Sequence, residues 1–187
     1  IVLYSSSDPI DLRTLMLELN LYESVHSPNM YGNLVMRDSA NHKQNAPILG
    51  QEELEFEIRI PDNETISFVN YRMRVYKVDN ITETAEREQV YTLHFMTKEA
   101  FKNTKTRVNT AREGPSEEIF TSVMRDAIET KKALHFEPSS TNFKLLGNNM
   151  RPYDYIRMLA RTANVQLLEL RDSLNLSARP LVDANIK

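Results

Sequence analysis

The segment from Glu53 to Ile60 alternates between charged and apolar residues without a break. A period of two is typical of a strand that buries one face and exposes the other. After a turn region that opens at Pro61, residues 68–78 alternate in the same way and predict the returning strand of an antiparallel hairpin. A fold for this chain must therefore contain an antiparallel sheet with one buried face.

The polar face of this hairpin is predicted to carry cross-strand ion pairs. When Leu54 is paired with Val75, the apolar residues of both strands lie on one face. Opposite charges then meet across the polar face, where each pair contributes roughly 0.2–1 kcal/mol. The predicted pairs are Glu57 with Arg72 and Glu55 with Arg74.

Three more segments show the pattern of strands. They are residues 12–22, with Leu15, Leu17, Leu19 and Leu21 on one face, residues 34–37 after Gly32, and residues 89–96. Five strands without long intervening helices are typical of an antiparallel barrel or sandwich. The first part of the chain, residues 1–111, is therefore predicted to be an antiparallel β-barrel domain.

Two connecting segments of this domain are predicted to lie at its surface. Met30 and Tyr31 are predicted to lie in a surface loop, where the pair either folds onto its own barrel or contacts another subunit. Residues 81–88 are polar and acidic and are predicted to form a loop or hairpin tip.

The pattern changes near Arg112. Pro115 followed by three polar residues predicts a helix start, and apolar residues at helical spacing continue it to about Thr130. A second helix is predicted from Pro152, and residues 165–177 predict a hairpin that turns at Arg171-Asp172-Ser173. Residues 112–187 are therefore predicted to be a small α+β domain, and the chain as a whole to be mainly β.

Composition excludes several kinds of chemistry. The chain has no cysteine, which removes disulfides and thiolate metal sites, and its four glycines are too far apart for a phosphate-binding loop. His26, His42, His94 and His135 lack metal-ligand spacing, so no metal or other cofactor is expected. The net charge of −3 disfavours specific nucleic-acid binding, and no segment reaches the ~20 apolar residues of a membrane span.

Two functional alternatives arise from these residues. The closely spaced Glu53, Glu55 and Glu57 suggest the two carboxylates of a glycan hydrolase, although facing arginines stabilise the ionised form and argue against a general acid. Strand aromatics such as Tyr91 suggest a single-stranded nucleic-acid binder, but the acidic charge and the lack of an RNP-like motif oppose it.

Small motifs at several positions resemble the baseplate hub proteins of contractile-tailed phages and the related hub region of type VI secretion spike proteins. In the first half they are Glu23-Ser24, Gly32, Asp38 and the run Pro47-Ile48-Leu49-Gly50-Gln51-Glu52-Glu53-Leu54. In the second half they are Pro152-Tyr153-Asp154-Tyr155-Ile156 and the turn at Arg171-Asp172. Ser173 departs from the family, whose hairpins more often have glycine after the aspartate.

The resemblance implies a non-enzymatic virion protein, assembled in the host cytoplasm and located in the tail baseplate. It implies a tail-tube-like barrel in residues 1–111 and a hub domain in residues 112–187 that is incomplete at its C-terminus, because the family continues into a second barrel. The implied partners are further copies in a ring, most simply a trimer, the tail tube protein, the central spike protein and other baseplate proteins.

The resemblance also suggests roles for particular residues. Subunit or partner contacts are expected at the projecting loops, at Met30, Tyr31, Asn80, Ile81 and Glu83. The polar face with Glu55, Glu57, Arg72 and Arg74 either lines a water-filled channel or simply faces solvent.

Overall fold

The computed structural model describes residues 1–4, 9–24, 29–39, 48, 50, 52–58, 69–85, 88–136, 141–163, 165–169 and 175–180. The chain forms two units, each with its own hydrophobic core. Unit 1 comprises Ile1–Glu23 and Asn29–Phe101, and unit 2 comprises Ser24–Pro28 and Lys102–Lys187. The assignment of residues 1–111 to a tube-like domain and of residues 112–187 to a hub domain stays a prediction.

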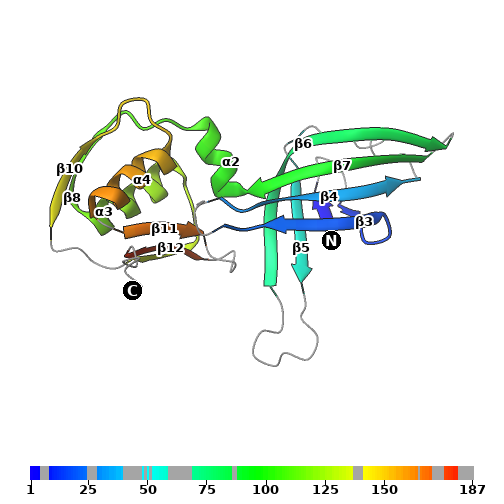
Figure 1. Ribbon diagram of the computed structural model, residues 1–187, viewed down its shortest axis with the longest axis horizontal. Helices are drawn as coiled ribbons and strands as arrows, with labels where there is room; N and C mark the ends of the chain where they lie inside the picture. Colours follow the sequence, from blue (N-terminus) through cyan, green and yellow to red (C-terminus); the bar gives the residue numbers. More distant parts are fainter. Residues whose placement is uncertain are drawn as a thin grey trace, which may run out of the picture. The chain divides into compact units, whose positions relative to one another are not determined.

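Seven strands form one antiparallel sheet in unit 1, in the order β2-β1-β5-β6-β7-β4-β3 (Figure 1). The strands are β1 (Val2–Tyr4), β2 (Ile10–Asp11), β3 (Met16–Tyr22), β4 (Tyr31–Asp38), β5 (Glu53–Ile58), β6 (Val69–Ala85) and β7 (Glu88–Thr97). The predicted antiparallel β fold of the N-terminal part is confirmed.

The sheet curls into a half-barrel because the two ends of the long strand β6 pair with different strands. Its first residues, 69–74, pair with β5, and residues 73–85 pair with β7. In Figure 1 the start of β6 runs beside β5 and the rest turns to follow β7. Only Leu12–Leu15 connect the two edge strands β2 and β3. A fully extended connection of this length spans about 18 Å, so the end of β2 and the start of β3 are no farther apart than that.

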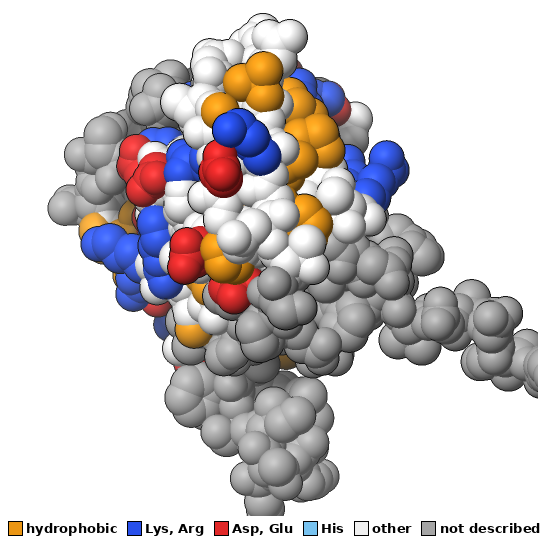
Figure 2. Space-filling view, turned by 90° about the vertical axis from the view of Figure 1, so that its left-hand side faces the viewer, with side chains coloured by type: hydrophobic (Ala, Val, Ile, Leu, Met, Phe, Trp, Pro, Cys, Tyr) orange, Lys and Arg blue, Asp and Glu red, His pale blue; other side chains and the backbone are white. Residues whose placement is uncertain are grey.

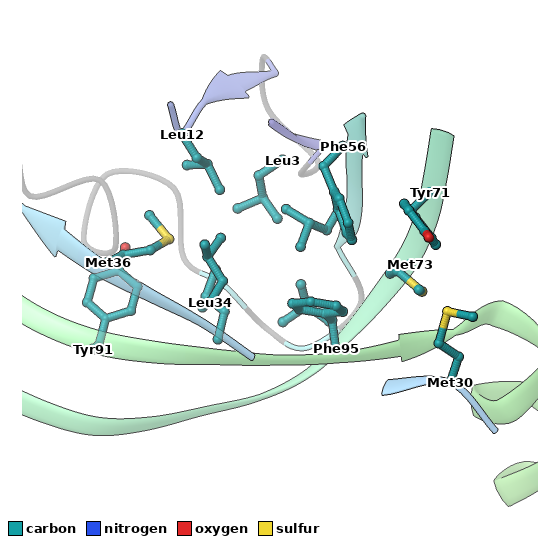
Figure 3. Close-up of a cluster of buried hydrophobic side chains, with 13 residues drawn as sticks. Leu3, Leu12, Met30, Leu34, Met36, Phe56, Tyr71, Met73, Tyr91 and Phe95 are labelled. Atoms are coloured by element: carbon teal, nitrogen blue, oxygen red, sulfur yellow. The ribbon is translucent and has the colours of Figure 1, made fainter. Parts of the chain in front are cut away.

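The concave side of the half-barrel holds the core of unit 1. Figure 3 shows Leu3 and Leu12 pointing across the interior toward Leu34 and Phe95. Phe95 meets the ring of Phe56 edge-on at 5.6 Å between centroids. The buried residues are Leu3, Leu12, Met30, Leu34, Met36, Leu54, Phe56, Tyr71, Met73, Val75, Tyr91, Leu93 and Phe95.

The register between β5 and β6 differs from the prediction by two residues. Leu54 pairs with Met73, where the sequence predicts Val75. A shift by two keeps every side chain on its face, so the hydrophobic pattern cannot distinguish the two registers. Val75 instead pairs with Phe95 of β7, and its N–H donates to the Glu52 carbonyl at 3.0 Å. The turn between these strands lies outside the described residues.

The structure refines two further predictions on unit 1. Leu17 is predicted to be inward but is 57% exposed, because a bulge between Met16 and Glu18 turns it away from the core. Residues 81–88 are predicted to be a loop or hairpin tip, and the second alternative fits better, because β6 continues to Ala85 and pairs there with Glu88 at the start of β7. Backbone pairing with β7 holds this polar stretch in a strand.

Unit 2 contains both helices that the sequence predicts. Residues 116–127 are helical, as α3 (Ser116–Ser122) and a π-helical turn (Val123–Ala127), and α4 covers Pro152–Ala163. The helix α2 (Lys98–Lys105) leads into the unit, and its Asn103 Oδ1 accepts a hydrogen bond of 2.8 Å from the Tyr153 N–H at the start of α4. Asn103 thereby satisfies one of the free N–H groups of that helix end.

Two small sheets complete unit 2. β8 (Ala111–Pro115) pairs with β10 (Asn142–Leu146), and β12 (Asn175–Pro180) lies between β11 (Val165–Glu169) and β9 (Ala133–Phe136). The predicted hairpin is confirmed as β11 and β12, while its turn at Arg171-Asp172-Ser173 lies outside the described residues. The parallel pairing of β9 with β12 has no counterpart in the sequence prediction.

Burial of Tyr91 makes the stability of unit 1 sensitive to alkaline pH. Its hydroxyl lies 3.5 Å from Asp38 Oδ2 in the core, and desolvation, with the charge of Asp38, raises the pKa of Tyr91 well above its usual value. The neutral form is therefore favoured in the folded state. Its contribution is fully present below about pH 10, the pKa of an unfolded tyrosine, and is lost as the pH rises further.

We expect Tyr91→Phe to weaken this alkaline loss. Urea unfolding followed from pH 8 to pH 12 should give a smaller fall in the free energy of unfolding for the variant than for the unmodified chain. The two curves should be parallel below pH 9.5. Curves that stay parallel to pH 12 would show that Tyr91 ionises equally easily in the folded and unfolded states.

Candidate assembly surfaces

The convex face of β5 and β6 carries the predicted charged residues. Arg72 Nε lies 3.2 Å from Glu55 Oε1, and the two residues are directly opposite each other in the ladder. The predicted partner of Glu55 was Arg74, so this pairing is a correction that follows from the two-residue shift. The side chain of Arg72 is 65% exposed, so the pair stabilises the fold by at most about 1 kcal/mol.

The other charged residues of this face find different partners from those predicted. Glu57 lies opposite Asn70, where the sequence predicts Arg72. Arg74 lies opposite Glu53, and its guanidinium is 5.9 Å from the ring centre of Phe101. Glu53 also pairs at 2.7 Å with Lys98, the first residue of α2.

We name this set the ladder surface: Glu53, Glu55, Glu57, Arg72, Arg74 and Lys98. Sequence reasoning missed Lys98, because its contact depends on the position of a helix start. The surface offers paired charges of both signs, which suit a hydrated or protein-facing wall.

Met30 and Tyr31 occupy different environments. Of the two alternatives predicted for this surface loop, Met30 follows the first, folding onto its own barrel: it is 1% exposed and belongs to the core, on the same side of the chain as the buried Leu34 and Met36 of β4. Its carbonyl accepts a hydrogen bond of 3.1 Å from the Thr97 N–H. Tyr31 is 47% exposed and stacks on Tyr22 of the edge strand β3, with ring centres 5.3 Å apart. The exposed pair at this edge is therefore Tyr22 and Tyr31.

Asn80, Ile81 and Glu83 lie together on the far half of β6. All three are exposed, Ile81 by 49%. Among the described strands, residues 77–85 pair only with β7, because the ladder with β5 ends at Arg74. We name residues 77–85 of β6, with the facing residues of β7, the β6–β7 arm.

An ion pair and a backbone hydrogen bond stabilise the first residues of the arm. The carboxylate of Asp79 binds the ammonium of Lys77 and accepts a hydrogen bond of 3.0 Å from the Asn80 N–H. These contacts, the lysine first, hold the pKa of Asp79 below its usual value. Asn80 has a positive φ of 52°, a conformation that asparagine tolerates better than most residues, and this marks the bulge in the arm.

Within the described residues no cluster of three or more potential metal ligands occurs. His94 lies on β7 with its Nε2 3.9 Å from Asp79 Oδ2, and the side chains of the other three histidines lie outside the described part. None of the helices described here is long and apolar enough to cross a membrane.

The fold is similar to solved structures from tails and secretion machines. A 43 kDa tail protein of prophage MuSo2 from Shewanella oneidensis matches 95% of this chain and 52% of its own, with a TM-score of 0.63 and 12% identity. The E. coli c3393 protein, a component of the type VI secretion system, matches 88% of this chain and 45% of its own, with a TM-score of 0.63 and 11% identity.

A third structure, the PdpA-VgrG complex of Francisella, matches 90% of this chain and 28% of its own, with a TM-score of 0.52 and 10% identity. No protein-family model and no curated protein sequence matches. The chain thus spans about half or less of the solved chains to which it is similar. What it shares with them is the fold.

Proposed function

We propose that the chain is a structural, non-enzymatic protein of a phage tail or related injection machine, and specifically its central baseplate hub. In this role copies form a ring, most simply a trimer, that joins the tail tube to the membrane-piercing spike. The observation that carries the proposal is the similarity to a prophage tail protein over 95% of this chain. Its place in the virion would be the tail baseplate.

The half-barrel itself suits a ring. Its edge strand β3 has Met16, Leu17 and Tyr22 exposed by about two fifths or more, and a neighbouring subunit can cover such an edge. A heterologous contact repeated around an axis closes a ring when its rotation divides a full turn. The described residues thus supply an edge that a second protein chain can complete.

The ladder surface is proposed to line the channel of this ring. Its charges are paired across strands, so it has no excess of positive charge that would retain a passing nucleic acid. The aromatic pair Tyr22 and Tyr31 and the β6–β7 arm are proposed as contacts with neighbouring proteins.

The experiment that tests the proposal is the mass of the purified chain in solution, measured by light scattering over a range of concentrations. The measurement is repeated after addition of the tail tube or spike protein of the same machine. We expect a mass of three or six copies, and a stable complex with the spike protein. A monomer under all of these conditions would contradict the hub role.

The hydrolase alternative is tested by turnover of peptidoglycan with Glu55→Gln and Glu57→Gln. A hub protein shows no turnover to lose. Turnover by the unmodified chain that disappears in either variant would contradict the non-enzymatic role.

A further inference from the structure

Charge is divided unevenly between the two units. Of the 26 acidic residues 16 lie in unit 1, together with 9 of the 23 basic residues. Unit 2 holds the other 10 acidic and 14 basic residues, so the formal charge is −7 on unit 1 and +4 on unit 2. Such a chain is attracted to a second copy when unit 1 of one copy approaches unit 2 of the other.

The β6–β7 arm presents one unpaired carboxylate beside an apolar residue. Among its described charged residues, Asp79 is paired with Lys77 and Glu88 with Arg37. Glu83 is exposed and forms no ion pair with any residue that the structure describes. Ile81, two positions earlier, is 49% exposed. The arm therefore offers an isoleucine and a carboxylate that is available to a partner.

The arm is poorly suited to adding another strand along its open edge. Its ladder with β7 is interrupted three times, between Val75 and Lys77, between Asp79 and Thr82, and between Glu83 and Ala85. Bulges and charged residues are the features that keep an edge strand from pairing with a foreign strand. Contact through side chains is the remaining way for the arm to bind.

The outer side of α4 in unit 2 is apolar and basic, which complements the isoleucine and the carboxylate of the arm. A cavity of about 450 Å³ lies there, with half-buried Met150 and Met158 and the exposed Arg157 and Arg161 among its lining residues. Arg157 is paired with Asp154 at 3.3 Å, whereas Arg161 forms no ion pair within the described part of the chain. Figure 2 shows one face of unit 2, on which hydrophobic, basic and acidic side chains lie close together.

We propose that the β6–β7 arm of one copy docks in the α4 cavity of a second copy. Ile81 then lies against the methionines, and Glu83 pairs with Arg161 at the rim. Pockets of roughly 300–1,000 Å³ accommodate a drug-sized group, so the volume suffices for an isoleucine and its neighbours. This inference rests on the self-association in the proposed function and specifies which surfaces meet.

The absence of cysteine makes a cross-linking test clean. Ile81→Cys is introduced in one preparation and Thr162→Cys, an exposed residue that lines the cavity, in another that carries a small tag. After mixing and mild oxidation, we expect a disulfide-linked dimer of one tagged and one untagged copy. The matched control is Leu146→Cys, an exposed apolar position of unit 2 outside the cavity, which should give at least tenfold less of the mixed dimer.

Charge reversal gives a second, independent readout. Glu83→Arg and Arg161→Glu are each expected to weaken self-association about tenfold at low salt, since each leaves like charges in contact. The double variant restores opposite charges and should return to within about threefold of the unmodified chain. Both residues are exposed, so these substitutions leave the cores intact.

The outcomes separate this inference from the proposed function. One outcome is a ring in light scattering together with equal cross-linking of Ile81→Cys to Thr162→Cys and to Leu146→Cys. That outcome would overturn the docking and would leave the hub role unaffected. A chain that stays monomeric contradicts both. Cross-linking of Thr162→Cys to added tube or spike protein, in place of a second copy, overturns the choice of occupant.

Discussion

Gly32→Ala should destabilise unit 1 by at least about 3 kcal/mol, because the position has no room for a methyl group. A Cβ atom built there lies 2.3 Å from the backbone oxygen of Asn20 and 2.5 Å from Cζ of Phe95. The first atom belongs to the neighbouring strand β3 and the second to a ring packed against Phe56. Neither is the free end of a flexible side chain, so relief requires movement of a strand or of the core.

The measurement is the free energy of unfolding in urea, with the melting temperature as a second readout. A loss of this size corresponds to a fall of about 12–24 °C for a unit of roughly 100 residues that unfolds by itself. Gly50→Ala is the matched control, since the nearest described atoms to its Cβ would be backbone atoms of Tyr76, with the oxygen at 3.3 Å. Gly50 has a positive φ of 81°, so the control should lose roughly 1–2 kcal/mol through backbone strain. A loss below 1 kcal/mol for Gly32→Ala would mean that β3 and β4 are separated more widely.

The sequence predicts the sheet of unit 1 because side-chain alternation depends only on the local period of two. That period also predicts which face is buried, as Leu54 and Phe56 show. It does not determine register, since pairing Leu54 with either Met73 or Val75 keeps the same faces together. The strands β1 and β2 have only three and two residues, too few for a pattern to emerge.

The candidate surfaces were harder to predict than the fold. Met30 and Tyr31 are neighbours in extended chain at the start of β4, so they point to opposite faces and only Tyr31 is exposed, but the sequence does not show that the strand begins there. The sequence leaves a loop and a hairpin tip open for residues 81–88 because they are polar, whereas backbone hydrogen bonds to β7 form irrespective of side-chain polarity. Met150 lines the α4 cavity but precedes the helix. The helical spacing of apolar residues in α4 therefore does not predict that Met150 lies beside Met158.

Ile156→Ala should destabilise unit 2 by about 2–5 kcal/mol while leaving unit 1 folded. Ile156 is 1% exposed on the inner face of α4 and packs in the core that includes Val123 and Leu159. Removing three carbons from such a site loses the transfer free energy of the buried groups and leaves a cavity. Arg157→Ala, at the next and exposed position of the same helix, is the control and should change stability by less than about 0.5 kcal/mol.

Hydrogen exchange distinguishes the response of the two units. The cores of unit 1 and unit 2 share no buried residue, so Ile156→Ala should speed exchange at the amides of α4, β8 and β10 by at least about thirtyfold. The amides of β4 and β7 should keep their protection, because the buried residues described for their core all belong to unit 1. Equal loss of protection in both units would instead mean that they unfold as one cooperative structure, since local opening of unit 2 would then cost as much free energy as global unfolding.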